Sequence, residues 1–190
     1  MFEEKSCLQA IGQGSEEALE QLYSHFGDRV FNTLLSYVKN KEDAEELLQD
    51  VFVTIYNTAV RFQFGSSVST WIYRITVNKS LDFLRKKKSK KRSGIFTSLY
   101  VKDTGTIQYE SPDFAHPGVQ LEHKENAQLL FRAIETLSEN QKTAFILTQI
   151  EGLPQKEVAA VMEKSQKSVE SLIKRARLHL KQELAIVFSE

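Results

Sequence analysis

Residues 69–92 read S-T-W-I-Y-R-I-T-V-N-K-S-L-D-F-L-R-K-K-K-S-K-K-R, a stretch in which an apolar helical pattern runs directly into a basic tract. Its first part carries aromatic and aliphatic residues at helical spacing, and residues 85–92 include seven basic side chains in eight. Aromatic rings stack on unpaired bases for roughly 1–3 kcal/mol each, while lysine and arginine bind phosphates by releasing counterions. The stretch therefore favours a helix that binds single-stranded or melting nucleic acid. The alternative is a core helix that ends in a solvated basic tail.

Charge is distributed unevenly along the chain, although its 190 residues balance to a net charge of zero. Residues 1–60 hold 4 basic and 11 acidic side chains, whereas residues 61–92 hold 10 basic and 1 acidic. Residues 93–126 are again mildly acidic, and residues 127–190 are nearly balanced. Such alternation favours two separate surfaces, a basic one for nucleic acid and an acidic one for a protein partner.

The composition is typical of a soluble globular protein, with 41% hydrophobic and 26% charged residues. No apolar run approaches the roughly 18 residues of a membrane span, and the acidic N-terminus lacks the features of a signal peptide. Cys7 is the only cysteine, so no internal disulfide can form, and a reducing compartment is favoured. These properties predict a cytoplasmic protein with no membrane insertion.

Two long helices are predicted before the basic stretch. Residues 15–39 have apolar side chains at helical spacing, with Ser15 as the N-cap and Gly27 as either a break or a weak point. Asn40 then caps a helix over residues 42–61, whose apolar stripe lies opposite a face of Glu42, Asp43, Glu45, Glu46, Gln49 and Asp50. That acidic face is either simply solvated or a docking surface for a basic protein partner.

Residues 62–69, F-Q-F-G-S-S-V-S, have the glycine and serine content of a loop. This loop places Phe62 and Phe64 shortly before Trp71. Rings on a loop beside a basic helix can clasp an extruded base. Equally, the same rings can fill the junction between two helices.

The helical pattern fails after residue 92. Residues 93–125 contain two of the three prolines and three of the eight glycines, with no apolar stripe. About 30 residues are long for a connection within one domain, so the sequence predicts a flexible linker between two domains, residues 1–92 and 126–190. The histidines in or near the linker, His116 and His123, are too sparse for a metal site.

The second half predicts a helix-turn-helix. Residues 126–137 have one apolar face, Ser138 and Gln141 match a capping box, and Pro154 suits the first turn of a short helix ending at about residue 162. A tight turn and a longer helix over residues 165–180 follow, with Val169, Ile173, Ala176 and Leu180 inward. The outer face of the longer helix is polar and basic, which suits the major groove of DNA. The alternative is an ordinary helical hairpin.

An enzyme is not indicated, because the sequence has no phosphate-binding glycine-rich loop, no metal-spaced cysteine and histidine cluster, and no local nucleophile motif. The four histidines are scattered along the chain. We therefore expect no catalytic residue, no cofactor and no bound metal.

Three motifs in order resemble bacterial RNA polymerase sigma factors of the extracytoplasmic-function (ECF) type. These motifs are D-A-E-E-L-L-Q-D-V-F at residues 43–52, the stretch at residues 69–88, and L-S-E-N-Q-K-T-A-F at residues 137–145 followed by S-V-E-S-L-I-K-R-A-R. The resemblance implies an all-α protein made of two small helical domains joined by a flexible linker. It also implies three partners: the clamp and flap of core RNA polymerase, promoter DNA, and a controlling anti-sigma factor.

The resemblance also assigns roles to residues. Glu46, Gln49 and Asp50 would dock on core polymerase. Bases flipped from the minus-ten promoter element would be held by five residues, namely Phe62, Tyr73, Asn78, Lys79 and Arg85. The minus-thirty-five element would be read by another five, Ser168, Glu170, Ser171, Lys174 and Arg175. Trp71 is expected to belong to the core.

Some positions depart from the family pattern, among them the glycine of F-Q-F-G-S-S, which is shifted by one. Glu163 stands in the helix-turn-helix turn where glycine is frequent, so the backbone there must adopt an unusual angle or reshape the turn. Glu170 stands where relatives are often basic; an acid repels phosphate but can accept a hydrogen bond from cytosine N4. The alternative function is a stand-alone helix-turn-helix regulator that binds duplex DNA without polymerase.

Overall fold

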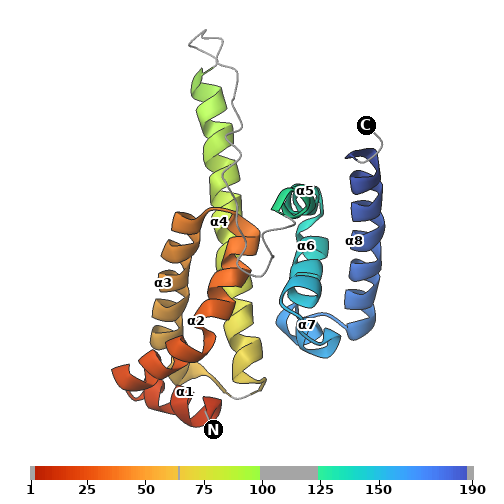
Figure 1. Ribbon diagram of the computed structural model, residues 1–190. Helices are drawn as coiled ribbons and strands as arrows, with labels where there is room; N and C mark the ends of the chain where they lie inside the picture. Colours follow the sequence, from red (N-terminus) through yellow and green to blue (C-terminus); the bar gives the residue numbers. More distant parts are fainter. Residues whose placement is uncertain (1–2, 64, 99–123, 188–190) are drawn as a thin grey trace.

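A computed structural model describes residues 3–63, 65–98 and 124–187, and side chains over residues 3–63, 65–90 and 129–185. Every regular element in these ranges is helical, so the all-α expectation is confirmed (Figure 1). The N-terminal half contains α1 (Glu4–Gly12), α2 (Glu16–Val38), α3 (Lys41–Thr58), the 3-10 helix η1 (Ala59–Arg61) and α4 (Val68–Ser98). The C-terminal half contains α5 (Lys124–Glu135), α6 (Glu139–Phe145), η3 (Ile146–Ile150), α7 (Gln155–Val161) and α8 (Gln166–Val187).

Helices α2 and α3 begin where side-chain caps satisfy free backbone N–H groups. The Ser15 hydroxyl accepts from the Ala18 N–H at 3.2 Å, and the Asn40 side chain accepts from the Asp43 N–H at 2.7 Å, as predicted. Gly27 does not interrupt α2, and a Cβ at that position would be 3.5 Å from the Tyr23 ring. The short helix α1 was not predicted, and it buries Leu8 and Ile11 against the bundle.

The N-terminal core forms where α2, α3 and α4 pack side by side, with α1 across one end. The apolar stripes predicted for the first two long helices face inward, and Leu22, Val51, Ile55 and Ile72 are fully buried. Burying such a side chain contributes about 1.5–3 kcal/mol. Hydrophobic contact therefore fixes α4 against α2 and α3 and leaves its basic end projecting beyond them (Figure 1).

Helix α4 continues through the basic tract to Ser98, past the linker start expected at residue 93. Long basic side chains are good helix formers when they are solvated, so the loss of the apolar stripe did not end the helix. The remainder of the predicted linker, with His116 and most of its glycines and prolines, lies outside the described residues, as does Phe64.

The C-terminal half is a compact helix-turn-helix unit. The capping box at the start of α6 is confirmed, because the Ser138 N–H donates to the Gln141 Oε1 at 3.1 Å. Helix α6 then widens into the π-helical segment η3, and Gly152, at φ 68°, turns the chain into α7. Pro154 precedes the first residue of α7 rather than lying within its first turn. The predicted inner stripe of α8 is buried from Val169 to Leu180.

Candidate nucleic-acid interface

One face of α4 carries polar and charged side chains at positions 74, 78, 82 and 85. Positions separated by four, four and three residues lie on the same side of an α-helix. Arg74 and Lys79 are half-buried, whereas Asn78 and Arg85 are exposed. This polar stripe of α4, defined as Arg74, Asn78, Asp82 and Arg85, includes two of the five residues predicted to hold flipped bases. Lys79 lies on another side of the same helix.

The aromatic residues predicted to hold bases lie in two separate places. Phe62, at the end of η1, packs against Trp71 with ring centroids 5.0 Å apart, so both rings are half-buried at the helix junction. Tyr73 is only 2% exposed, and burial raises the pKa of its hydroxyl to about 12. Its charged neighbours include Arg29 in α2 and Glu151 and Glu157 in the C-terminal half. Tyr73 is therefore buried near charged groups of both halves.

Basic side chains of α4 pair with carboxylates on neighbouring helices. Lys79 lies 3.8 Å from Asp50, and Lys87 donates to Asp43 at 2.9 Å. Residues predicted to bind polymerase and DNA therefore contact each other here. Exposed pairs of this kind contribute little stability, about 0–1 kcal/mol, and phosphate can compete for the same lysines.

The face of α3 predicted to dock on polymerase is exposed. Glu46, Gln49 and Asp50 all lie on the surface, spaced so that they share one side of the helix. The same side continues into the exposed apolar residues Val53 and Tyr56. The sequence reasoning missed this apolar extension, although the spacing from Gln49 to Val53 to Tyr56 was a sufficient signal.

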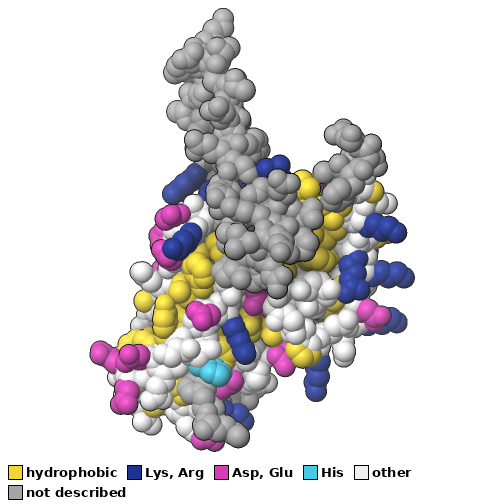
Figure 2. Space-filling model, in the orientation of Figure 1, with side chains coloured by type: hydrophobic (Ala, Val, Ile, Leu, Met, Phe, Trp, Pro, Cys, Tyr) yellow, Lys and Arg dark blue, Asp and Glu magenta, His cyan; other side chains and the backbone are white. Residues whose placement is uncertain are grey.

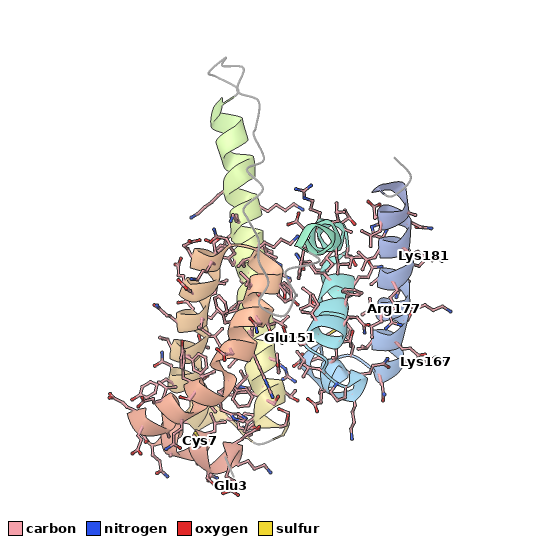
Figure 3. All side chains as sticks on the ribbon, viewed as in Figure 1. Glu3, Cys7, Glu151, Lys167, Arg177 and Lys181 are labelled. Carbon is pink, nitrogen blue, oxygen red and sulfur yellow. The ribbon has the colours of Figure 1, made fainter. Side chains whose placement is uncertain are left out.

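The helix-turn-helix presents a basic outer face. Glu170, Ser171, Lys174 and Arg175 are exposed on α8, and Ser168 is half-buried near its start. Lysine and arginine side chains gather over this edge of the molecule (Figure 2), and Figure 3 shows Lys167, Arg177 and Lys181 along the same helix, which lies on the side away from α4. The arrangement suits entry of α8 into a major groove.

The turn of this motif contains the unusual residue noted from the sequence. Glu163 adopts a left-handed backbone, with φ at 53°. The Lys164 N–H donates to the Ala159 carbonyl at 3.0 Å and the Met162 N–H to the Val158 carbonyl at 2.9 Å. Helix α7 is therefore followed by the left-handed residue that commonly ends a helix, although this residue is glutamate and not glycine. The left-handed backbone has a local conformational cost for a residue with a Cβ.

The two halves pack against each other through α2 and α4 on one side and α5, α6, η3 and α7 on the other. Lys39 Nζ donates to the Phe131 carbonyl and lies 3.0 Å from Glu135. Desolvation lowers the pKa of Lys39 to about 8, although Glu135 raises it in part. Lys142, which is buried, lies 5.7 Å from the centre of the Tyr37 ring.

Glu151, just after η3, lies between the two groups of helices (Figure 3). Desolvation raises the pKa of its carboxyl from 4.5 to about 7, while the Thr33 hydroxyl and the charge of Arg29 act in the opposite direction. Both of those neighbours belong to α2. Packing between the two halves therefore gives this carboxyl its raised pKa.

Sequence reasoning missed the domain contact entirely. Lys39 and Phe131 are 92 positions apart, and Arg74 and Ala160 are 86 apart. No periodicity or motif links such distant residues, so no local signal marks Lys39, Arg74 or Glu151 as contact residues. The fold and these surfaces together define a two-domain helical protein with one basic helix and a helix-turn-helix, a class suited to binding nucleic acid at two places.

Comparison with known proteins identifies the family to which this chain is similar. A model of Sigma-70 region 2 matches residues 22–90, and a model of Sigma-70, region 4 matches residues 127–180. The ECF RNA polymerase sigma-E factor of Haemophilus influenzae is 27% identical over 176 residues, which cover 92% of this chain and 91% of that protein. Its Escherichia coli K12 counterpart is 27% identical over 177 residues, covering 90% and 88%.

Solved structures show the same fold. CnrH, in complex with the cytosolic domain of CnrY, gives a TM-score of 0.69 at 22% identity and covers 96% of this chain and 97% of that one. The sigma factor RpoE from Bartonella quintana, in complex with the anti-sigma factor NepR, gives 0.63 at 22% identity and covers 88% and 96%. The chain belongs to the sigma-70 family as an ECF-type sigma factor, a transcription initiation factor.

Two absences apply to the described residues alone. None of their helices combines the length and hydropathy needed to cross a bilayer. Within the same ranges, histidine, cysteine and carboxylate side chains do not form a group of three or more placed to hold a metal ion.

Proposed function

We propose that this sigma factor uses its two domains on separate promoter elements while bound to core RNA polymerase. The N-terminal domain docks on the polymerase clamp and traps melted minus-ten bases, and the C-terminal domain reads the duplex minus-thirty-five element. The proposal rests on the order of two structural units along the chain. A basic helix matching region 2 is followed by a helix-turn-helix matching region 4, and each presents polar and basic side chains at the surface.

For the minus-ten element, the proposal uses α4 and the loop before it. Asn78 is exposed and can hydrogen-bond a base edge, while Lys79 and Arg85 supply positive charge for phosphates. Phe62 and Tyr73 supply rings on which an unstacked base can stack. Because Tyr73 is 2% exposed in this arrangement, it takes this role only after a rearrangement that exposes its ring.

For the minus-thirty-five element, the proposal uses the outer face of α8. Lys174 and Arg175 contact phosphates or guanine, and Ser168 and Ser171 add hydrogen bonds near the start of the helix. Glu170 accepts from cytosine N4, which reads sequence without adding affinity for phosphate. The C-terminal domain also contacts the polymerase flap.

Docking on core polymerase uses the exposed face of α3. Glu46, Gln49 and Asp50 provide acidic and polar contacts for a basic surface on the clamp. The adjoining Val53 and Tyr56 give that face an apolar centre of the kind found in stable protein interfaces.

Joining the two weak DNA contacts on one polymerase raises their effective concentration, so neither domain needs high affinity alone. The protein acts as a binding factor with no chemistry of its own, in the cytoplasm where polymerase and DNA are found. The solved complex of the sigma factor RpoE with the anti-sigma factor NepR supports control by an anti-sigma partner.

The deciding experiment is run-off transcription from a randomised promoter library by core polymerase of the host, with and without this protein. We expect initiation from a recurring two-box sequence only when the protein is added. Absence of stimulation, together with binding of the protein alone to duplex DNA, would replace the proposal with a stand-alone regulator.

A further inference from the structure

Helix α1 lies across one end of the N-terminal bundle, where it contacts η1 as well as α2, α3 and α4 (Figure 1). Leu8 and Ile11 anchor the helix in the core, since they are only 1% and 2% exposed. The surfaces proposed above for polymerase and DNA all lie on other elements. Helix α1 is therefore held firmly at the point where α3 ends, next to the segment that leads to the loop before α4.

Gly12, the last residue of α1, brings the backbones of α1 and η1 close together. A Cβ at this position would lie 3.2 Å from the Val60 Cα, 3.3 Å from the Val60 N and 3.5 Å from the Ala59 carbonyl carbon. These are backbone atoms, so they cannot rotate away as the end of a side chain can. Because glycine has no Cβ, it permits this approach, and the contact holds η1 at a short distance from α1.

The position of η1 in turn fixes Phe62, the residue that follows it. The Phe62 N–H donates to the Ala59 carbonyl at 3.1 Å, and Ala59 is buried. The Phe62 ring packs on Trp71 in α4, with ring centroids 5.0 Å apart and an interplanar angle of 40°. A displacement of the η1 backbone therefore reaches this ring pair through one hydrogen bond and one residue.

The Trp71 ring is held by α4. The Ser67 hydroxyl accepts from the Thr70 N–H at 3.0 Å and the Ser67 carbonyl from the Trp71 N–H at 3.1 Å, so the first turn of α4 is capped. Val68 and Ile72, on either side of Trp71 in the sequence, are buried. A shift of η1 therefore changes the placement of the two rings relative to each other.

We propose that Gly12 is a positioning residue for minus-ten recognition, because its close contact with η1 sets where Phe62 lies against Trp71. The inference rests on the role proposed above for Phe62, whose ring accepts an unstacked base. A Cβ at Gly12 would displace η1 by a few tenths of an ångström. Stacking depends on the separation and tilt of the rings, so this shift lowers the preference for the base that fits the existing ring pair.

Trp71 is the only tryptophan in the chain, so its fluorescence in the full-length protein reports the ring pair directly. Gly12→Ala should raise the constant for collisional quenching by acrylamide, because a displaced Phe62 leaves the half-buried Trp71 more accessible. Phe62→Leu removes the partner ring and gives the size of the full effect. The constant for Gly12→Ala should lie between those of wild type and Phe62→Leu, with an unchanged circular dichroism spectrum.

Two control variants separate this contact from a general effect on the bundle. Gly27→Ala also adds a Cβ to a helical glycine, but its nearest neighbour, the Tyr23 ring, would be at 3.5 Å, an ordinary van der Waals distance. Ile11→Val removes one buried methylene group of α1 and leaves the contact with η1 in place. Both should keep wild-type quenching of Trp71. Unchanged quenching in Gly12→Ala, or an equal rise in Ile11→Val, would overturn the inference.

Selectivity is measured by run-off transcription with core polymerase, from the two-box sequence that the wild-type protein selects and from its single-base changes. Gly12→Ala should lower the preference for one minus-ten base by about 5-fold, which corresponds to about 1 kcal/mol and is part of the free energy of stacking. The preferences at the minus-thirty-five element should stay at their wild-type values. Unchanged minus-ten preferences, or equal losses at both elements, would refute the positioning role.

The Phe62→Leu variant distinguishes failure of this inference from failure of the proposed function. If Phe62→Leu loses minus-ten selectivity and Gly12→Ala does not, the role of Phe62 stands and that of Gly12 is refuted. If Phe62→Leu keeps every minus-ten preference, the proposed role of Phe62 is wrong and recognition through Gly12 is refuted with it. In that case the quenching of Trp71 still decides whether Gly12 positions the Phe62 ring.

Discussion

Exchange of Glu151 for glutamine should stabilise the protein at neutral and alkaline pH and leave it almost unchanged in acid. The physical reason is the position of this carboxyl between the two halves, where desolvation raises its pKa from 4.5 to about 7. Above pH 7 the folded protein must carry a charge in a site that favours the neutral acid. Glutamine has nearly the same shape and never carries that charge.

The sign and size follow from proton linkage. Between pH 4.5 and about 7 the folded state holds the proton that the unfolded chain has released, so stability falls as pH rises and levels off above pH 7. At about 1.4 kcal/mol for each factor of ten in acidity, the full penalty is about 3 kcal/mol. Water reaches the half-buried Glu151 in part, so we expect a gain of about 1–2 kcal/mol for the variant at pH 8.

The assay is urea unfolding followed by circular dichroism at pH 4.5, 6, 7 and 8, with Glu20→Gln as the same exchange at an exposed position. Charges elsewhere in the protein titrate equally in both chains, so the difference between variant and wild type isolates Glu151. A gain of the same size at every pH, or a less stable variant at pH 8, would refute the assignment of a buried carboxyl at the domain contact.

Three further outcomes are expected. Combined Lys174→Ala and Arg175→Ala should abolish selectivity for the minus-thirty-five element in run-off transcription and leave binding to core polymerase intact in a pull-down; loss of core binding would show that α8 serves a different partner. Asn40→Ala should lower the free energy of unfolding by about 1 kcal/mol in urea titration, because the Asp43 N–H loses its cap; no change would mean that the cap is dispensable. Tyr37→Phe should lower stability by no more than about 1 kcal/mol in thermal unfolding, since the hydrogen bond that its buried hydroxyl would lose is one neutral bond to the Thr143 hydroxyl; a larger loss would show that the hydroxyl has a stronger partner.

Much of the architecture could be predicted from the sequence, because apolar spacing and helix caps depend on residues close together in the chain. Apolar spacing in α2, α3 and α8 predicted their inner faces, and Asn40, Ser15 and Ser138 marked helix starts through hydrogen bonds that span only three residues. The same spacing left α1 unnoticed, because nine residues with few charges offer little periodicity. The end of α4 was placed too early, because the apolar stripe stops before the helix does.

For the candidate binding surfaces, the sequence predicted which residues are exposed. Exposure of Glu46, Gln49 and Asp50 on α3, and of Lys174 and Arg175 on α8, follows from helix geometry, because polar residues opposite an apolar stripe face the solvent. Their roles in binding polymerase and DNA remain predictions.

Helices, caps, the basic tract and the family motifs could be predicted from the sequence, because each depends on neighbours within a turn or two. Tertiary structure alone decided which charges meet across the molecule, including Lys39 with Glu135, Arg74 with Glu163 and Arg85 with Glu139. It also decided that Tyr73 is covered and that Glu151 is desolvated. The physical reason is that burial and ion pairing depend on distances in space, and residues more than fifty positions apart leave no local pattern that records those distances.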